Sequence, residues 1–597
     1  METVTITIDG QPVTVDRNKS VLQAAIEHGF AVPYYCYHPA LGVDGSCRVC
    51  IVKIEKMSKL QTACSTPVSD GMVVYTKTPD VIEARAGVFE FLLINHPLDC
   101  PVCDKGGECP LQDFSYTFGP EESRMVFPRR TFDGEGVKAD VDFGPTLMLN
   151  RNRCILCTRC VRFMKEVDGD AQIGILDRGH GSEIATFQEE GVHSLISGNL
   201  MDVCPVGAIT TRDYRFKSRP WDNPAAVDTI CTLCSKGCNT TAWIKAKPEW
   251  AKGARLVRFT PRLNADVNGY WMCDIGRFEY HWVEGDARLR RPLVRDGAGQ
   301  QQAVSWHDLL VNLRDHFTSV DPREAPLQVL TSAHASLEEL FLLRTLAGGL
   351  GGAPVAVSWR YREKQQPAST VFRVPAADAP NINGARDLGL STGAGNDGPP
   401  DLAALRNAIE RGDIKALYVF DPGPEGSIGD VSWIADARSS GRLPLLVVQG
   451  VLMTPLARMA DFVLPGASYV EKDASYTNDQ GRVQAAAAVN PPPGDAMEDW
   501  QILVNLATSL GLRVPHGAPA SIRGAIGAEL AGNPAYAEIG SLAFARPVTA
   551  RHWLQTSNPS ERWKWDFLFQ DLPPVKFDTP DRGKRPAVMP LTPVQDE

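Results

Sequence analysis

The cysteines of this chain are confined to its first half and fall into four groups. All 15 lie between residues 36 and 273 of the 597. Because the first residues, METVTITIDG, lack the basic segment and apolar core of a secretory signal or transit peptide, we expect metal-bound thiols rather than disulfides. The groups are Cys36, Cys47, Cys50 and Cys64; Cys100, Cys103 and Cys109; Cys154, Cys157, Cys160 and Cys204; and Cys231, Cys234, Cys238 and Cys273. This pattern predicts four separate thiolate-bound metal centres.

The second group, in HPLDCPVCDKGGECPLQD at residues 96–113, has three cysteines and needs one further ligand. His96 precedes the first of them by four residues and is followed by Pro97. A helix is predicted to begin at Pro79, after the cap residue Thr78, and to end near His96, with one apolar side made of Val81, Ala84, Val88, Phe91 and Leu92. We predict that His96 completes a set of 16 donors. The alternatives are an ordinary histidine and a zinc site, since zinc also accepts three cysteines and a histidine.

The third group contains the compact run CILCTRC at residues 154–160 and a distant cysteine followed by proline, Cys204-Pro205. This spacing resembles that of bacterial ferredoxins and predicts a 4Fe-4S cluster on Cys154, Cys157, Cys160 and Cys204. A ferredoxin with two clusters would carry four more cysteines, at positions that here are Met164, Ser194, Ser197 and Leu200. We therefore predict a single cluster in this domain.

Residues 1–78 predict a small domain built on a strand hairpin. TVTITID and PVTVD alternate apolar and polar residues around the turn signal Asp9-Gly10, and Ser20 with Gln23 forms a capping box for a short helix. A hairpin, a helix and a cysteine loop resemble the β-grasp fold of plant-type 2Fe-2S ferredoxins, although the spacing C-x10-C-x2-C-x13-C differs from theirs. The resemblance implies a 2Fe-2S cluster on Cys36, Cys47, Cys50 and Cys64. A zinc ribbon is the alternative, but it would need two short C-x2-C hooks, and this group has one.

The fourth group, CTLCSKGC with the later Cys273, resembles the amino-terminal 4Fe-4S module of molybdopterin oxidoreductases. The resemblance implies a 4Fe-4S cluster on Cys231, Cys234, Cys238 and Cys273, although four thiolates alone do not exclude zinc.

Residues 281–520 alternate predicted strands and helices, which indicates a doubly wound α/β domain similar to that of the same enzymes. This region is short for a complete enzyme of that class and has no cysteine to bind molybdenum, so no molybdenum cofactor is expected. The glycine-rich stretches at 348–352 and 392–398 lack the strand, glycine loop and helix of a nucleotide site and are predicted to be loops.

Composition and the end of the chain narrow the remaining possibilities. With a net charge of -10, only short basic stretches and no long apolar run, the chain is expected neither to bind nucleic acid nor to span a membrane directly. Six prolines after residue 572 predict an extended tail. Just before them, Trp563, Trp565, Phe567 and Phe569 recur every second residue, which predicts either an edge strand or an anchor on a neighbouring subunit.

Taken in order, these motifs resemble the large iron-sulfur subunit, known as the G subunit, of proton-pumping NADH:quinone oxidoreductase, respiratory complex I. The matching stretches are YYCYHPALGVDGSCRVC, HPLDCPVCDKGGECPLQD, NRCILCTRCVRF, SGNLMDVCPVGAIT, RFKSRPWD, CTLCSKGCN and, late in the chain, ADFVLPGASYVEKDASYTNDQGRVQ. The resemblance implies electron transfer from a flavin- and NADH-binding subunit toward the quinone, beside a 2Fe-2S partner subunit and quinone-proximal 4Fe-4S subunits. It implies that the first three clusters lie on the electron path and the fourth off it. Since the fourth is found in bacterial members of this family, it also implies a peripheral position at the cytoplasmic face of a bacterial inner membrane.

The expected fold class is therefore α+β with several domains. They are a 2Fe-2S β-grasp domain (1–78), a 4Fe-4S segment with one histidine and three cysteines as ligands (79–120), a 4Fe-4S ferredoxin-like domain (121–222), a 4Fe-4S molybdopterin-oxidoreductase module (223–280), a truncated α/β domain (281–520) and an extended tail (521–597). No catalytic residue can be singled out, because the chain has no persuasive flavin or nicotinamide motif and no clear acid–base pair. The alternatives are an electron-transfer subunit of an NAD-linked formate dehydrogenase or hydrogenase, a catalytic molybdoenzyme, and a scaffold with structural zinc.

Overall fold

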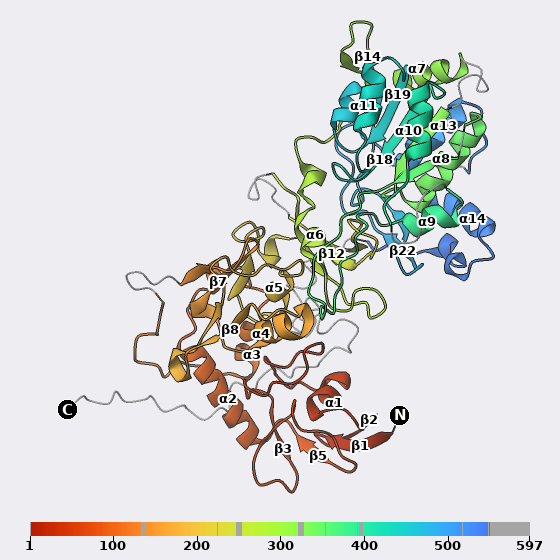
Figure 1. Cartoon of the computed structure of the whole chain (residues 1–597). Helices are drawn as coiled ribbons and strands as arrows, with labels where there is room; N and C mark the ends of the chain where they lie inside the picture. The colour runs from red at the N-terminus through yellow and green to blue at the C-terminus, as the bar shows by residue number, and fades with distance from the viewer. Residues whose placement is uncertain are drawn as a thin grey trace.

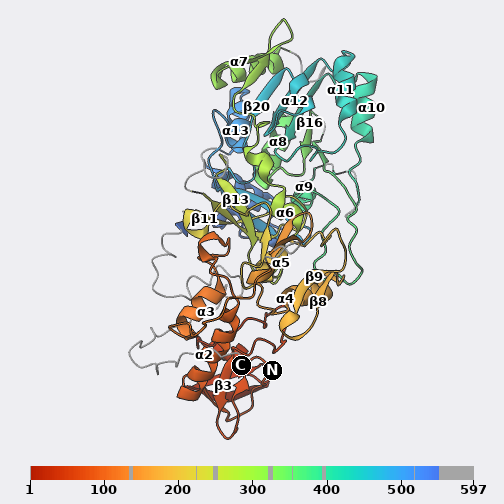
Figure 2. The same ribbon diagram turned by 90° about the vertical axis from the view of Figure 1, so that its left-hand side faces the viewer.

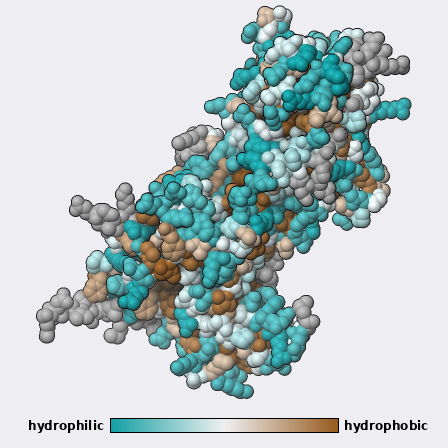
Figure 3. Space-filling view, viewed as in Figure 1, coloured by the Kyte–Doolittle hydropathy of each residue, from teal (hydrophilic) through white to brown (hydrophobic). Residues whose placement is uncertain are grey.

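The computed structural model describes residues 2–132, 139–223, 225–245, 253–319, 327–352, 354–390, 392, 398–515, 518–546 and 548–549. Figures 1 and 2 show an elongated molecule, with the amino-terminal domain at one end, the α/β domain at the other and the remaining cysteine-bearing segments between them. On the face seen in Figure 3, apolar residues gather mainly in the middle of the molecule. Within the described ranges, no helix is both long and apolar enough to cross a bilayer. The predicted aromatic run and proline-rich tail lie outside these ranges.

The amino-terminal domain is a five-stranded β-grasp sheet with one helix. Its strands, in the order β2-β1-β5-β3-β4, are β1 (Thr3–Ile8), β2 (Gln11–Asp16), β3 (Ile51–Ile54), β4 (Gln61–Thr62) and β5 (Val73–Tyr75). The predicted hairpin is confirmed, since β1 pairs antiparallel with β2 and the turn residues Asp9 and Gly10 have positive φ. Helix α1 (Val21–Glu27) begins at the predicted capping box of Ser20 and Gln23. The long loop between α1 and β3 carries three of the four cysteines of the first group.

A long helix, α2 (Pro79–Ile94), leads from this domain to the second cysteine group and is followed by η1 (Cys100–Val102) and α3 (Pro110–Phe118). As predicted, α2 begins after Thr78 and ends just before His96. Its predicted apolar side is confirmed in part: Val81 is buried and Val88 and Leu92 pack against the core, but Phe91 is 79% exposed, and Arg85 and Phe89 are buried instead. The physical reason is Arg85, whose buried guanidinium donates hydrogen bonds to two backbone carbonyls of the β-grasp domain and so fixes the rotation of the helix.

The third cysteine group lies in a domain of short elements. A sheet of order β10-β7-β6 joins β6 (Asp140–Asp142), β7 (Leu147–Asn150) and β10 (Ile209–Thr211), and β8 (Ile173–Leu176) pairs with β9 (Glu183–Thr186). The helical elements are η2 (Arg151–Arg153), α4 (Arg159–Phe163), the π-helical turn η3 (Met164–Asp168), η4 (Gly179–Gly181) and α5 (Asn199–Val203). Met164 and Leu200, which stand where a second cluster would have cysteines, are fully buried in the apolar core. Side chains therefore fill this part of the domain.

The fourth cysteine group belongs to a module with an antiparallel sheet of order β13-β12-β11-β23. The strands are β11 (Ala225–Ile230), β12 (Asn239–Ile244), β13 (Leu256–Pro261) and β23 (Val548–Thr549). The helical elements beside it are η5 (Pro220–Asp222), α6 (Asp274–Phe278) and η7 (His281–Glu284). Pairing of β11 with β23 shows that the chain returns to this module after the α/β domain.

The α/β domain is built on a seven-stranded mixed sheet of order β15-β14-β20-β19-β18-β16-β17. The strands are β14 (Leu293–Arg295), β15 (Gln301–Ala303), β16 (Leu327–Ser332), β17 (Ala356–Ser358), β18 (Ala416–Asp421), β19 (Leu445–Gly450) and β20 (Phe462–Pro465), and a separate hairpin pairs β21 (Ala474–Thr477) with β22 (Val483–Ala486). Strands β16 to β20 are parallel to one another, and β14 and β15 run antiparallel at one edge. Parallel strands need both faces covered, and the helices do this.

Two sets of helices cover the two faces of this sheet (Figure 1). One core contains side chains of α7 (Trp306–Thr318), α8 (Leu337–Gly349), α9 (Ile382–Asp387), α13 (Asp499–Ser509) and α14 (Pro519–Glu529). The opposite core contains side chains of α10 (Ala403–Arg411), α11 (Ser432–Ser439) and α12 (Pro455–Met459). The predicted doubly wound architecture is therefore confirmed.

Two local expectations differ from the structure. Gly348 and Gly349 belong to the last turn of α8 rather than to a loop, while most of the stretch at 392–398 lies outside the described residues. Residues 521–529 are helical instead of extended, because Ile522 and Ile526 of α14 are buried in the α/β core. The short turns η8 (Pro534–Tyr536) and η9 (Ile539–Ser541) follow.

Candidate metal centres

The first centre is formed by Cys36, Cys47, Cys50 and Cys64, which the β-grasp domain brings together. The thiol of Cys36 is hydrogen-bonded with those of Cys47 and Cys64, and Cys50 with Cys64. These hydrogen bonds lower the pKa of Cys36 and of Cys50, although burial opposes the effect. The same contacts raise the pKa of Cys47 and of Cys64. No described cysteine forms a disulfide. Four adjacent free thiols match the donor set of a thiolate-bound centre.

Two arginines hold the loop of the first centre from outside its domain. Arg162, on α4, donates a hydrogen bond to the carbonyl oxygen of Cys36. Arg159, on the same helix, donates to the carbonyl of Tyr37 at 2.7 Å and to that of Val203 at 3.2 Å. Because Val203 directly precedes the last cysteine of the third group, these side chains fix the first centre against the third.

The second centre lines a cavity of about 640 Å³. All four predicted ligands, His96, Cys100, Cys103 and Cys109, contribute to its walls. Cys100 is exposed to solvent, whereas Cys103 and Cys109 are buried. The structure therefore gathers the predicted donors around a space that is open at one side.

The imidazole of His96 has the properties expected of a ligand. Its Nδ1 atom is buried and has no hydrogen-bond partner among the described residues. Burial, with the nearby positive charge of Arg153, lowers the pKa of His96 to about 4, so the ring is neutral at physiological pH. Metal binding requires neutral imidazole, and a buried nitrogen without a partner costs free energy unless something binds it. Both features support the prediction for His96.

A backbone segment of the third centre forms one wall of the second. A Cβ atom on Gly207 would lie 2.0 Å from the sulfur of Cys103, so any side chain at this position would overlap that sulfur. The carbonyl oxygen of Pro205 lies 3.8 Å from the sulfur of Cys109. Both residues follow Cys204 directly in the motif CPVG, so the two centres share this stretch of backbone.

The third centre is closed and apolar. Its cavity of about 20 Å³ is lined by Cys154, Cys157, Cys160 and Cys204 together with Leu149, Ile155, Ile184, Val206, Ala208 and Ile209. Leu156 and Thr158 have left-handed backbone conformations, which turn the chain between successive cysteines. Burial raises the pKa of Cys154 to about 12 and that of Cys157 to about 11. Thiols so difficult to ionise become thiolates when a bound cation compensates their charge, which fits a metal centre shielded from water.

The fourth centre brings together four buried cysteines, Cys231, Cys234, Cys238 and Cys273. The thiols of Cys234 and Cys273 are hydrogen-bonded, and the backbone N–H of Cys231 donates to the carbonyl of Cys238 at 2.8 Å. A Cβ atom on Gly276 would lie 2.8 Å from the sulfur of Cys231, so the start of α6 also needs a glycine close to the thiols. The four predicted donors thus lie close to one another.

The arrangement of the thiols bears on the choice between zinc and iron-sulfur clusters. Within the part of the chain that the structure describes, no three His, Cys, Asp or Glu side chains converge tightly enough to hold one metal ion. A zinc ion needs four ligand atoms at about 2.0–2.3 Å from a single point. The ligands of a cluster are instead distributed over several irons, so they surround a larger volume. Metal analysis therefore decides between zinc and clusters at these four sites.

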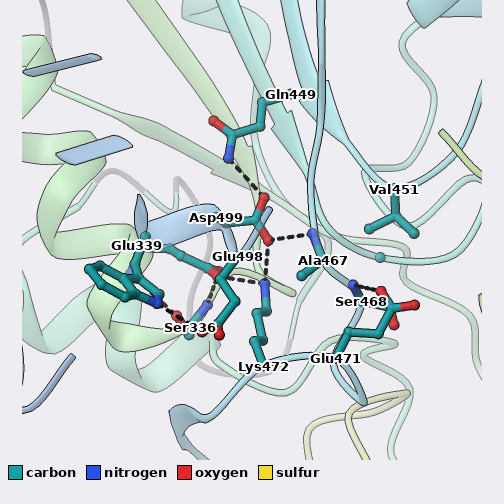
Figure 4. Close-up of polar contacts among 12 residues, drawn as sticks. Ser336, Glu339, Gln449, Val451, Ala467, Ser468, Glu471, Lys472, Glu498 and Asp499 are labelled. Carbon is teal, nitrogen blue, oxygen red and sulfur yellow. Dashed lines mark hydrogen bonds and ion pairs between the residues drawn. The ribbon is translucent and has the colours of Figure 1, made fainter. Parts of the chain in front are cut away.

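The α/β domain contains no cysteine, but it encloses a buried ionic network (Figure 4). The Nζ atom of Lys472 lies 2.5 Å from a carboxylate oxygen of Glu339 and 2.8 Å from one of Asp499. None of the three side chains is more than 2% exposed. Asp499 also accepts a hydrogen bond from the amide of Gln449 at 2.8 Å. Each of the three charged groups has an oppositely charged partner at hydrogen-bond distance, which indicates a structural role rather than a free reactive group.

The sequence did not reveal the residues that fix the centres relative to one another. Arg159, Arg162 and Gly207 contact groups far away in the chain, so no local spacing identifies them. Gly207 alone had a local signal, since it directly follows the cysteine-proline pair of a ligand motif and precedes alanine in CPVGA.

Models of known families match four parts of the chain. Residues 1–79 match a 2Fe-2S iron-sulfur cluster binding domain, and residues 85–124 match the NADH-ubiquinone oxidoreductase-G iron-sulfur binding region. Residues 144–210 match the ferredoxin-like domain of NADH-quinone oxidoreductase subunit 3, and residues 378–509 match molybdopterin oxidoreductase. These matches contain the first three centres and much of the α/β domain.

Individual relatives match along most of the chain. The mitochondrial NADH-ubiquinone oxidoreductase 78 kDa subunit of Candida albicans is 31% identical, over 87% of this chain and 84% of its own length. The G subunit of NADH-quinone oxidoreductase from Rickettsia bellii is 30% identical, over 85% of this chain and 87% of its own length.

A solved structure of an NAD+-reducing [NiFe]-hydrogenase in the H2-reduced state is 28% identical, over 37% of this chain and 93% of that chain, with a TM-score of 0.32.

Proposed function

This chain belongs to the family of the G subunit of NADH-quinone oxidoreductase, the iron-sulfur electron-transfer subunit of complex I, and on that premise we propose that it holds four clusters. It carries a 2Fe-2S domain and 4Fe-4S-binding regions. The family relation extends over most of the chain and favours a complex I subunit over the alternative of a formate dehydrogenase or hydrogenase subunit. The observation that carries the proposal is the gathering of His96 with three cysteines around one cavity, beside three sets of four cysteines.

The proposed ligands are the 16 donors predicted from the sequence. Cys36, Cys47, Cys50 and Cys64 hold a 2Fe-2S cluster, and His96 with Cys100, Cys103 and Cys109 holds the first 4Fe-4S cluster. The other two 4Fe-4S clusters are held by Cys154, Cys157, Cys160 and Cys204, and by Cys231, Cys234, Cys238 and Cys273. When bound, such clusters supply one-electron carriers whose potentials depend on ligand type, hydrogen bonding and solvent access. No molybdenum cofactor is proposed, because the α/β domain offers no thiol for it.

The contacts between centres support a path through the first, third and second centres. Arg159 and Arg162 hold the loop of the first centre against α4 of the third. The segment from Pro205 to Gly207 lies between the third and second centres and touches the cysteines of the second. The fourth centre adjoins the α/β domain, which has no cysteine for a further cluster. An electron path that entered the fourth centre would therefore end at that centre. We therefore place the fourth cluster off the path.

The exposure of the second centre supports an exit for electrons at this point. Cys100 is exposed, and the apolar side chains of Leu98, Val102 and Tyr116 beside this centre are 81%, 55% and 65% exposed. Exposed apolar residues around a redox centre suit the docking of another subunit. We propose that a quinone-proximal 4Fe-4S subunit binds here, while the flavin-bearing and 2Fe-2S partner subunits deliver electrons from NADH. The full ligand set of the fourth centre supports a bacterial complex, placed peripherally at the cytoplasmic face of the inner membrane.

Metal analysis tests this proposal. Protein purified without oxygen should contain about 14 iron atoms and about 14 acid-labile sulfides per chain. About ten irons together with zinc would remove one 4Fe-4S cluster from the proposal. Changing His96→Cys or His96→Ala should alter the paramagnetic signal and the potential of the second cluster; an unchanged signal in both variants would show that His96 is not a ligand. Identification of the chains that co-purify tests the proposed partners.

A further inference from the structure

The cysteine loop of the second centre is held by residues that come much later in the chain. The carboxylate of Asp104 accepts hydrogen bonds from the backbone N–H of Phe216 at 3.1 Å and from Arg219 at 2.6 Å. The ring of Trp221 packs so closely on Gly107 that a Cβ atom there would lie 2.8 Å from it. Residues 100–109 therefore depend on the segment between the third and fourth centres for their position.

The strongest of these contacts is an ion pair between Glu108 and Arg258. The two guanidinium Nη atoms donate to the two carboxylate oxygens at 2.8 and 2.7 Å, which makes the pair bidentate. The side chain of Arg258 is 8% exposed and that of Glu108 is 15% exposed. Glu108 directly precedes the proposed ligand Cys109, and Arg258 lies on β13 in the module of the fourth centre. One buried pair thus joins the fourth module to a ligand of the second centre.

The guanidinium of Arg258 is itself fixed between two aromatic rings. Its Cζ atom lies 4.5 Å from the centroid of Tyr214 and 4.4 Å from that of Trp243. The hydroxyl of Tyr214 accepts a hydrogen bond from Asn223 at 3.2 Å, and the indole N–H of Trp243 donates to Thr260 at 3.0 Å. A planar cation between two anchored rings has one orientation, which arginine can adopt and lysine cannot reproduce. The pair therefore presents Glu108 to the loop in a defined position.

The charge of the pair matters as much as its geometry. A buried carboxylate next to a thiolate-bound cluster would add negative charge in a medium of low dielectric constant and disfavour reduction. Arg258 cancels that charge where it arises. We infer that Arg258 is a positioning residue for the second cluster, which orients Cys109 through Glu108 and sets the potential of the cluster by compensating the Glu108 carboxylate. This inference rests on the proposed ligation of a cluster by His96, Cys100, Cys103 and Cys109.

The fourth module then has a role that does not depend on electron transfer through its own cluster. Its sheet supplies Arg258 on β13 and Trp243 on β12, and the neighbouring segment supplies Tyr214. These three side chains form the support on which Glu108 rests. The fourth module lies off the electron path, but it thereby controls the environment of the second cluster, which lies on that path.

The test uses the purified complex and a redox titration of the second cluster followed by electron paramagnetic resonance. Arg258→Met leaves a buried negative charge and should shift the midpoint potential to more negative values. Glu108→Gln removes that charge and should shift it to more positive values. The double variant should return close to the wild-type potential, and Arg258→Lys should fall between wild type and Arg258→Met, because it keeps the charge but loses the bidentate geometry. The control is Arg482→Met, which breaks an exposed pair with Asp266 and should leave the potential unchanged.

The inference is supported if the midpoint potential shifts in opposite directions in the two single variants and returns near the wild-type value in the double variant. A purely structural defect would not reverse the direction of the shift when the sign of the uncompensated charge is reversed. Equal or absent shifts in a cluster that still assembles would overturn it. If Arg258→Met fails to assemble the second cluster, the direction of the shift in Glu108→Gln decides alone, because this variant retains the shape of the side chain. Absence of a second-cluster signal in the wild-type complex would contradict the proposed function instead.

Discussion

The iron-sulfur half and the α/β domain of this protein are stabilised in different ways. In the first, most elements other than α2 are short, and cysteines of all four groups belong to one continuous buried core. In the second, a seven-stranded sheet is covered on both faces by helices, and the region contains no cysteine. Buried thiols are confined to the first region, whereas both regions bury charged groups, such as the pair of Glu108 with Arg258 in the first and the charges around Lys472 in the second.

The difference shows how metal and protein divide the task of stabilisation. A core that contains ionisable thiols is complete only when a metal compensates their charge, so metal binding and folding are coupled there. A parallel sheet buries apolar side chains and needs no such partner. Perturbations of metal binding should therefore affect one region, and perturbations of the ionic network the other.

The largest effect is expected from removal of iron. A chelator acting on the reduced protein should increase the hydrogen exchange of β3, β7 and β12 while β16, β18 and β19 remain protected. If metal binding contributes at least about 3 kcal/mol to local stability, exchange in the iron-sulfur half should rise at least about 100-fold. Mass spectrometry of exchanged peptides measures this. Simultaneous loss of protection in both regions would show that they form a single cooperative unit.

A single methyl group should produce the next largest effect. In Gly207→Ala, the new Cβ atom would lie 2.0 Å from the sulfur of Cys103 and 3.3 Å from the Cβ of Lys105, so the loop of the second centre must move. We expect the second cluster to lose at least half of its paramagnetic signal, while the 2Fe-2S signal and the protection of the α/β domain remain.

The matched control for this variant is Gly87→Ala. Gly87 lies in α2, the helix that leads to His96, and no atom beyond its chain neighbours and the backbone of its own helix lies within 4 Å of a Cβ built there. This control should keep all cluster signals and, in the middle of a helix, should gain about 0.5–1 kcal/mol of stability. A normal second-cluster signal in Gly207→Ala would mean that the shared backbone segment is not a tight wall.

Much of this organisation follows from local sequence signals. The hairpin at Asp9-Gly10, the capping box at Ser20 and the start of α2 after Thr78 each depend on residues close together in the chain, and the structure contains all three. The alternation that predicted the doubly wound domain likewise reports local periodicity, which the sheet and its two helical layers confirm. The grouping of ligands follows from cysteine spacing, and the assignment of the 16 donors stays a prediction that metal analysis must test.

What the sequence could not supply depends on contacts between distant segments. The prediction for α2 failed at Phe91 and omitted Arg85, because buried Arg85 reaches the backbone of Ile51, 34 residues earlier. The pairing of Glu108 with Arg258 spans 150 residues, and each side chain alone resembles an ordinary surface charge. The prediction of an extended tail failed at residues 521–529 for the same reason. These residues are helical because Ile526 acquires its core neighbours only in the folded domain.

Loss of the central cation of the α/β domain should have a smaller and strictly local effect. Lys472→Met leaves the carboxylates of Glu339 and Asp499 buried without a cationic partner, which should cost about 3–5 kcal/mol. Denaturant unfolding monitored by exchange in β18 and β19 measures the loss, and the absorption of the clusters should not change. The control Lys53→Met breaks an exposed pair with Asp80 and should leave unfolding unchanged. A cost below about 1 kcal/mol would show that the carboxylates take up a proton when the lysine is absent.

The smallest effect is a dependence of α/β-domain stability on pH. Burial, reinforced by Asp499 and opposed by Lys472, raises the pKa of Glu339 from 4.5 to about 7. One ammonium group lies between two buried carboxylates, and the resulting net negative charge favours proton uptake. The folded state therefore binds more protons than the unfolded state between about pH 4.5 and pH 7. The contribution of Glu339 protonation to the stability of the domain is complete below this pH range and is lost as the pH rises through it.

Comparison of wild type with Glu339→Gln isolates this contribution. The amide oxygen of glutamine can still accept the hydrogen bond that the backbone N–H of Ser336 donates to Glu339 at 2.8 Å. Burial lowers the pKa of His334 to about 4, which gives a slope of opposite sign, but both proteins share it and it cancels in their difference. Between pH 5 and pH 7.5, the wild-type domain should lose stability relative to the variant, with a slope of at most about 1.4 kcal/mol per pH unit. If the stability of the two proteins depends on pH in the same way across this range, Glu339 is already ionised throughout. Glu339, Lys472 and Asp499 then carry a net negative charge without taking up a proton.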